Sequence, residues 1–143
     1  MYLDDLKTGM EFDIPPVTID EKEMLDFSRR YNPIPIHCDE EYAKNTKFGK
    51  VIASGYMSFM AVWAEFMKND IFGDELIAGK SSKIEWYRPV FAGDVLSGKV
   101  TVKNVVRRND YNGICEITID VINQDNEPVL KNITESIVKY KKL

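Results

Sequence analysis

Histidine and cysteine are scarce in this chain of 143 residues. His37 is the only histidine, and the two cysteines, Cys38 and Cys115, lie far apart in the sequence. Structural zinc sites need four Cys or His ligands at short spacings, which these residues do not provide. We therefore expect no metal site, and we expect both thiols to be reduced.

An excess of positive charge and a long apolar run are also missing. The chain has 19 Lys and Arg residues against 23 Asp and Glu residues, for a net charge of −4. Nucleic-acid binding relies on clustered basic residues, and we interpret the tail lysines 139, 141 and 142 as solvated instead. No stretch reaches the roughly 20 apolar residues that span a bilayer, and the N-terminus has no secretory signal pattern. We expect a cytoplasmic protein with no nucleic-acid or membrane partner.

The composition is sufficient for one hydrophobic core. Hydrophobic residues make up 44% of the chain and charged residues 29%, which is ordinary for a globular domain. No repeat, low-complexity stretch or Gly/Ser/Pro-rich linker divides the sequence. It therefore predicts a single domain over residues 1–143.

The first half of the chain is mainly helical by pattern. A short strand is expected over 11–19, and Asp20 is a suitable N-cap for a helix over 22–29 that ends before Pro33. The strongest helix is expected over 54–69, where apolar residues recur at helical spacing. These residues are Tyr56, Phe59, Met60, Trp63, Phe66 and Met67. Because Ala61, Val62 and Ala64 fill much of the other side, we expect the rest of the protein to enclose this helix.

The second half shows the alternating pattern of strands. Ile117, Ile119 and Val121, with Ile133 and Ile137 as their counterparts, are typical of half-buried strands. Hairpin turns are expected at 109–113 and 124–127. The four strands are expected over 78–87, 95–106, 113–122 and 129–140. The order predicts an α+β fold, in which a curved antiparallel sheet wraps around the long helix and extends across a dimer.

The segment around His37 carries the candidate chemistry. Pro33 and Pro35 are expected to fix a short extended stretch that aims His37 out of a loop. Histidine titrates near neutrality, so it can take or give a proton at physiological pH. Taken alone, a loop histidine is more often a surface or hydrogen-bonding residue.

A longer pattern resembles the hydratase signature of MaoC-like proteins, a family that includes the (R)-specific enoyl-CoA hydratases. It is carried by Tyr31–Asp39, Glu41–Ala43, Phe48–Gly55 and Tyr87–Leu96. The resemblance implies a hot-dog fold and the hydration of a trans-2-enoyl thioester, or the reverse dehydration of a 3-hydroxyacyl thioester. The implied substrates are acyl-CoA or acyl-ACP. It implies no metal or redox cofactor, and it implies a homodimer or a higher oligomer of dimers.

The resemblance also assigns roles to particular residues. His37 corresponds to the histidine that activates water, and the amide of Gly55 corresponds to the group that binds the thioester oxygen. Physical reasoning agrees, because a helix N-terminus offers unpaired amides to a developing enolate. We expect the missing side chain of Gly55 to leave room for the substrate. The expected substrate-binding residues are Ser54, Tyr56, Phe59 and Trp63.

Asn32 departs from the family pattern, which has an aspartate at this position. An amide cannot act as a general base, although it can orient a water molecule. Three hypotheses follow. His37 acts alone with Asn32 placing the water, another carboxylate substitutes, or the protein binds acyl thioesters as a catalytically degenerate member without hydrating them.

Other residues near the signature have weaker alternatives. Asp39 is interpreted as the N-cap of a helix over 40–44, and a Cys38–His37 nucleophile is disfavoured because adjacent side chains rarely point to one spot. Glu65, a carboxylate in the helix expected over 54–69, would be the catalytic group if the protein were a hot-dog thioesterase. It is expected to share one side of that helix with Ser58, Val62 and Asn69, and that side is expected to be solvated. Four basic residues flank the signature: Arg29, Arg30, Lys47 and Lys50. They could contact the phosphates of coenzyme A, or they could simply be solvated on the protein surface.

Overall fold

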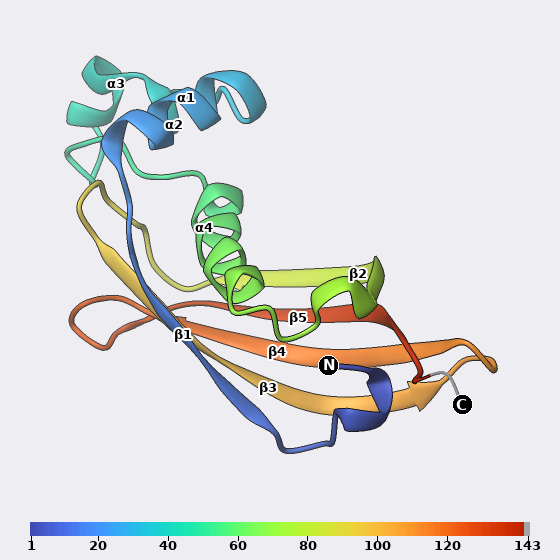
Figure 1. Ribbon diagram of the computed structural model, residues 1–143. Helices are drawn as coiled ribbons and strands as arrows, with labels where there is room; N and C mark the ends of the chain where they lie inside the picture. The colour runs from blue at the N-terminus through green and yellow to red at the C-terminus, as the bar shows by residue number, and fades with distance from the viewer. Residues whose placement is uncertain (142–143) are drawn as a thin grey trace.

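The computed structural model describes residues 1–141, so Lys142 of the tail lies outside the described residues. Figure 1 shows the elements in chain order. The helical elements are η1 (Leu3–Asp5), α1 (Glu21–Tyr31), α2 (Pro35–Cys38), α3 (Glu40–Lys44), α4 (Gly55–Lys68) and η2 (Gly73–Glu75). The strands are β1 (Glu11–Thr18), β2 (Leu76–Trp86), β3 (Val95–Arg107), β4 (Asn112–Ile122) and β5 (Pro128–Lys139).

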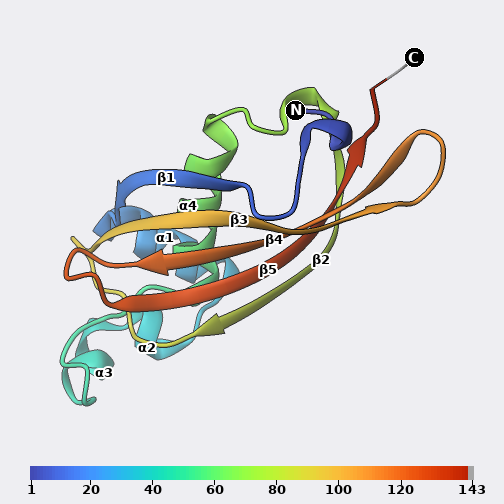
Figure 2. The same cartoon turned by 90° about the horizontal axis from the view of Figure 1, so that it is seen from below.

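The five strands form one antiparallel sheet in the order β1-β3-β4-β5-β2. The sheet curves around α4, and its strand order can be followed in Figure 2. Both expected hairpin turns are present. In the first, the side chain of Asn109 accepts hydrogen bonds from the amides of Tyr111 and Asn112, and in the second Asn126 adopts a φ of +59°. The predicted α+β hot-dog arrangement is therefore confirmed.

The helices before α4 follow the predicted caps but correct one expectation. Asp20 and Asp39 cap α1 and α3, each accepting a hydrogen bond from the amide three residues on. Ile34, between the two prolines, is extended as predicted, but the expectation that His37 projects from a loop was wrong, since Pro35 is the first residue of α2 and His37 lies in that single helical turn. A proline is favourable at this position because its fixed φ suits a helix and its missing N–H would have no partner there.

The core lies between α4 and the concave face of the sheet. Val62 and Phe66 of α4 and Ile117 and Ile119 of β4 are fully buried there. Ile133 and Ile137 are half-buried, but their grouping with Ile117 was wrong. They point to the opposite face, because their paired neighbours on β4 are residues 118 and 114. The buried face of β5 instead carries polar side chains, namely Asn132, Thr134 and Ser136.

Helix α4 is enclosed on one side only. A stripe at fourfold spacing, formed by Tyr56, Met60 and Ala64, is exposed in the single chain. The expectation of a fully enclosed helix was therefore wrong for the single chain. The stripe of Ser58 and Val62, expected to be solvated, is instead the side that packs on the sheet. No helix within residues 1–141 has both the length and the apolar character needed to cross a membrane.

Candidate active site

A cavity of about 410 Å³ lies where α4 begins. The segment α1–α3 covers this end of the molecule, and the end of β2 forms the opposite wall (Figures 1 and 2). The cavity brings together Asn32, His37 and Gly55, the three residues for which the sequence predicted a catalytic role. The other lining residues are Phe48, Ile52, Ala53, Tyr56, Ser58, Trp86, Tyr87, Arg88, Pro89 and Val90.

His37 is held in one orientation by the chain segment that follows α3. Its Nδ1 lies 2.9 Å from the carbonyl oxygen of Ile52, and the amide of Ile52 donates to the carbonyl of Ile36. A carbonyl oxygen can only accept, so Nδ1 carries the proton in this hydrogen bond. In the neutral imidazole, Nε2 is therefore the basic nitrogen. His37 is half-buried and lines the cavity, so its side chain is accessible to a bound molecule.

The first turn of α4 presents uncapped amides. The amide of Ser58 makes the first intrahelical bond, to the carbonyl of Ser54 at 3.0 Å, so the amides of Gly55, Tyr56 and Met57 precede the helical ladder. The hydroxyl of Ser54 makes no capping hydrogen bond. Unpaired amides and the positive end of the helix dipole both favour a developing negative charge. This turn is therefore suited to binding an oxyanion.

The Ser54 hydroxyl makes its hydrogen bond to Asn32 and not to the first turn of α4. The side-chain Nδ2 of Asn32 donates to the Oγ of Ser54 at 2.9 Å. The backbone N–H of Asn32 donates to the carbonyl of Ser28 at the C-terminal end of α1. With Nδ2 engaged, Oδ1 is the part of the Asn32 amide left to accept a hydrogen bond from water. Ser54 is fully buried, so its part in the site is to hold Asn32.

The space beside Gly55 is occupied by an indole ring. A Cβ added to Gly55 would lie 2.3 Å from Nε1 of Trp86, so any side chain at this position would collide with the ring. The rings of Trp86 and Tyr56 meet edge to face, with centroids 5.2 Å apart. The expectation that the bare Gly55 makes room for substrate is therefore corrected, because the room is taken by Trp86.

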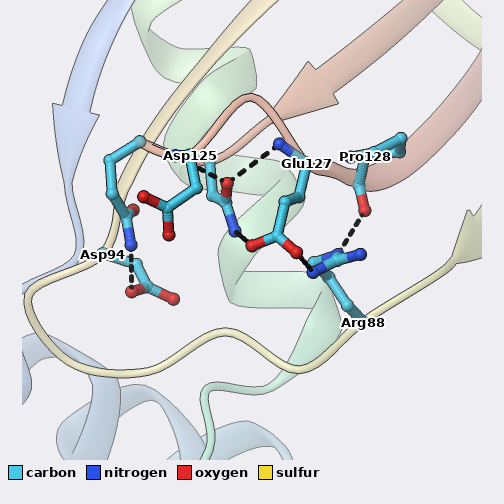
Figure 3. Close-up of polar contacts among 7 residues, drawn as sticks. Arg88, Asp94, Asp125, Glu127 and Pro128 are labelled. Carbon is cyan, nitrogen blue, oxygen red and sulfur yellow. Dashed lines mark hydrogen bonds and ion pairs between the residues drawn. The ribbon is translucent and has the colours of Figure 1, made fainter.

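Arg88 lines the cavity and is fixed to the β4–β5 hairpin by polar contacts (Figure 3). Its Nε donates to the carbonyl of Pro128 at 2.9 Å, and Nη1 pairs with the carboxylate of Glu127. Asn123 donates to the same carboxylate, and this hydrogen bond, assisted by Arg88, lowers the pKa of Glu127. In the same hairpin, the side chain of Gln124 donates to Asp94.

No role was predicted from the sequence for Trp86 or Arg88. One feature of the sequence could have pointed to Trp86. Side chains alternate between the two faces of β2, which puts Trp86 on the same face as Ser82 and Ile84, and Trp86 directly precedes the Tyr87–Leu96 motif. That alternation shows which face a residue occupies but not which helix it meets. The contact with α4 depends on the curvature of the sheet.

The remaining expected residues lie elsewhere. Phe59 and Trp63 line a second cavity of about 350 Å³ with Gly79, Lys80, Ser81, Ser82 and Thr134. Glu65 pairs with Lys68 and lines neither cavity. The thiol of Cys38 lies against the carbonyl of Ile34, away from the His37 cavity. Within residues 1–141, no three His, Cys, Asp or Glu side chains are grouped to hold a metal ion.

The four candidate cations are spread over several elements. Arg29 and Arg30 occupy the last turn of α1, where the negative end of the helix dipole stabilises positive charge. Lys47 and Lys50 follow α3, and their amino groups lie over the rings of Phe48 and Phe91, 5.3 and 4.6 Å from the centroids. None of the four is among the residues that line the His37 cavity.

Comparisons with solved structures show the same fold over nearly the whole chain. A monoamine oxidase regulatory protein from Archaeoglobus fulgius superimposes with a TM-score of 0.92, 24% identity and coverage of 99% of this chain and 96% of that one. A MaoC-like dehydratase from Rhodospirillum rubrum has a TM-score of 0.84, 26% identity and coverage of 100% and 99%. The R-hydratase PhaJ1 from Pseudomonas aeruginosa has a TM-score of 0.79, 23% identity and coverage of 99% and 88%.

The family comparison matches the part of the chain that builds the cavity. The model described as MaoC like domain covers residues 5–124, which include α1–α4, β2 and the motif that follows β2. This is well over half of the chain. The protein therefore belongs to the family of MaoC-like domains.

Proposed function

We propose that this protein is a hydro-lyase that hydrates trans-2-enoyl thioesters and, in reverse, dehydrates 3-hydroxyacyl thioesters. The substrates would be thioesters of coenzyme A or of an acyl carrier protein. The observation that carries the proposal is the combination of a basic Nε2 on His37 with uncapped amides at the start of α4, in one cavity. Membership of the MaoC-like family and the likeness to an R-hydratase support the same reaction class.

In the proposed hydration, Asn32 Oδ1 accepts a hydrogen bond from the water molecule, and Nε2 of His37 takes a proton from it. The water oxygen bonds to the β-carbon while the electrons of the double bond move to the thioester oxygen. The amide of Gly55 donates to the resulting enolate oxygen. The imidazolium then returns its proton to the α-carbon, which completes the 3-hydroxyacyl thioester and restores neutral His37. Dehydration runs through the same steps in reverse.

A second candidate is an acyl-thioester-binding protein without hydratase activity. The specific observation in its favour is Asn32, whose amide cannot accept the proton that an aspartate would take. General acid–base catalysis contributes roughly 10²- to 10⁴-fold in rate, so the loss of one base could silence the site while leaving its cavity intact. The two candidates differ in turnover and not in binding.

Hydration of crotonyl-CoA separates these candidates. We expect the wild-type protein to consume the conjugated enoyl absorbance, and we expect His37→Ala to lower kcat by about 10²- to 10⁴-fold. Glu65→Gln is the matched control, because Glu65 is a carboxylate on α4 that lines neither cavity. It should leave hydration unchanged.

The Asn32→Asp variant distinguishes a silent site from an absent one. If the wild type is inactive and Asn32→Asp hydrates crotonyl-CoA, the protein binds acyl thioesters and has lost its base. Activity lost in Glu65→Gln and retained in His37→Ala would contradict the proposed mechanism and would favour chemistry at Glu65. If no variant is active and no acyl thioester binds, the proposed function is wrong.

We also propose that the protein forms a homodimer. Strand β2 lies at the edge of the sheet, with no further strand beyond it within residues 1–141, and Tyr56, Met60 and Ala64 form an exposed stripe on α4. Both leave groups that a second copy would cover. A strand edge exposes unpaired backbone groups, and pairing it with another edge is a common way to satisfy them.

A further inference from the structure

The fixed charge that lines the His37 cavity has one sign. Arg88 lines this cavity, and no Asp, Glu or Lys among residues 1–141 lines it. The uncapped first turn of α4 adds the positive end of a helix dipole to the same cavity. The cavity is therefore suited to a ligand that carries negative charge.

The amides of α4 have a partner in the proposed reaction, whereas Arg88 has none. The enolate oxygen forms at the Gly55 amide, and the proton moves between water, His37 and the α-carbon. A crotonyl group carries no further polar atom, so it offers nothing to the guanidinium of Arg88. A charged side chain that lines the cavity without a part in the chemical step is suited to recognising a second group on the substrate.

The guanidinium of Arg88 is held from the hairpin and keeps free donors. Its Nε donates to Pro128 and its Nη1 pairs with Glu127, and neither partner lines the cavity (Figure 3). Among residues 1–141, no acceptor contacts the N–H groups of Nη2. A guanidinium is planar, so two contacts of this kind fix its orientation. The N–H groups of Nη2 are then available to a ligand in the cavity.

We infer, resting on the proposed function, that Arg88 binds a carboxylate on the acyl group, so that the substrates are half-thioesters of unsaturated dicarboxylic acids. Arginine binds carboxylates strongly, because its N–H groups make charge-assisted hydrogen bonds to the carboxylate oxygens. The alternative anion is a phosphate of the coenzyme or carrier protein. The long pantetheine arm holds that phosphate far from the thioester, whereas a short acyl tail keeps its carboxylate in the same cavity of about 410 Å³ as the reacting atoms.

Kinetics with two substrates of similar shape test this inference. In trans-glutaconyl-CoA the enoyl chain ends in a carboxylate, and in 5-methyl-trans-2-hexenoyl-CoA an uncharged isopropyl group takes its place. We expect the wild type to have a kcat/KM at least about tenfold higher for the glutaconyl substrate. Arg88→Gln should lower this value by about 10- to 100-fold and change the value for the uncharged substrate by less than about threefold, because only the first substrate loses a charged hydrogen bond.

Arg107→Gln is the matched control. Arg107 also pairs with a carboxylate at a hairpin, that of Asp110, but it does not line the cavity. This variant should change neither value. Arg88→Gln leaves Glu127 without its ion-pair partner, so thermal unfolding is needed to show that the variant is folded. If it is not, the double variant Arg88→Gln/Glu127→Gln replaces it, with the same expected selectivity.

Thioesters of N-acetylcysteamine distinguish the two anions, because they contain no phosphate. We expect Arg88→Gln to lower kcat/KM for the glutaconyl thioester of N-acetylcysteamine as strongly as for glutaconyl-CoA. If Arg88→Gln instead lowers kcat/KM for both CoA thioesters and for neither N-acetylcysteamine thioester, Arg88 binds a phosphate and the inference is overturned.

Binding of saturated thioesters provides a readout that does not need turnover. Calorimetry with glutaryl-CoA and 5-methylhexanoyl-CoA should show that the wild type binds glutaryl-CoA more tightly. Arg88→Gln should remove this difference, and Arg107→Gln should keep it.

The possible failures point to different conclusions. Hydration of the uncharged substrate without a preference for glutaconyl-CoA, or with a preference that a folded Arg88 variant retains, overturns the inference and leaves the proposed function standing. Absent hydration, with a glutaryl preference that Arg88→Gln removes, overturns the hydratase and keeps the role of Arg88. A wild type that binds none of these thioesters overturns both.

Discussion

At His37, one hydrogen bond determines which ring nitrogen is available for chemistry. Because Nδ1–H donates its hydrogen bond to the carbonyl of Ile52, Nε2 is left as the base in the neutral ring. The neighbouring Asn32 is oriented in a similar way, with Nδ2 donating to Ser54. Both bonds come from the segment directly before α4, so a few residues set the orientation of the whole candidate constellation.

The two thiols should differ strongly in reactivity. Cys115 is fully buried on β4, and this burial, together with the charge of Glu116, raises the pKa of its thiol to about 11. At pH 8 its thiolate fraction is then roughly a hundredfold lower than that of a cysteine at the ordinary value of 9.0. We expect iodoacetamide to modify half-buried Cys38 in the native protein and Cys115 only after urea unfolding, as followed by mass spectrometry.

The same pKa shift has a consequence for stability. The folded state disfavours the charged thiolate of Cys115, so this group's contribution to the free energy of unfolding is full below pH 9 and is lost as the pH rises toward 11. Cys115→Ser, whose hydroxyl does not ionise in this range, should flatten that part of the pH profile. Equal slopes in both proteins, or rapid native labelling of Cys115, would contradict this account of its environment.

At the scale of elements, β5 turns a polar face toward α4. Asn132 Nδ2 donates to Ser82, whose Oγ lies 3.1 Å from Thr134 Oγ1, and Thr134 donates back to Asn132 Oδ1. The three side chains therefore close a ring of hydrogen bonds between β5 and β2. A buried polar group is tolerated when its hydrogen bonds are satisfied, and here each partner satisfies the next.

Removing one member of this ring should destabilise the fold. Thr134→Val keeps the side-chain shape but leaves Asn132 Oδ1 without its donor, and we expect a loss of about 1–3 kcal/mol in the free energy of unfolding. Urea unfolding followed by circular dichroism measures it. Ser81→Ala removes an exposed hydroxyl that donates to Glu135, and it should cost under about 0.5 kcal/mol. A Thr134→Val protein as stable as wild type would show that the ring contributes nothing to stability.

At the scale of the whole molecule, the apolar character of α4 exceeds what one chain covers. Tyr56 and Met60 are 57% and 48% exposed, although Val62 and Phe66 on the other side of the helix are completely buried. Apolar side chains grouped in this way on a surface commonly mark an interface. The adjacent β2 edge would let two sheets join beside paired α4 helices.

A charge in the exposed stripe should separate the proposed dimer. We expect light scattering after size-exclusion chromatography to give the wild type a dimeric mass, and Met60→Glu a monomeric mass, because an unpaired carboxylate in an apolar interface is strongly unfavourable. Lys22→Gln, at an exposed position on α1 away from this stripe, is the control and should remain dimeric. A dimeric Met60→Glu protein would exclude this stripe as the interface.

The order and type of the main elements were predictable from the sequence. Hydrophobic periodicity distinguished α4 from the strands that follow it, and Asp20, Asp39 and the hairpin turns marked where elements begin and end. The signature around His37 and Gly55 indicated the family and the residues of the candidate site. These are local signals, since propensity, capping and alternation act over a few neighbouring residues.

Contacts between distant segments were decided only by the tertiary structure. Trp86 reaches Gly55 because the curved sheet brings the end of β2 over the start of α4, and no local pattern encodes that curvature. The face to which Ile133 points depends on strand register, where a shift of one residue reverses every side chain. The sequence alone therefore determined which groups are available for chemistry, and the packing of helix against sheet determined how the cavity around them is closed.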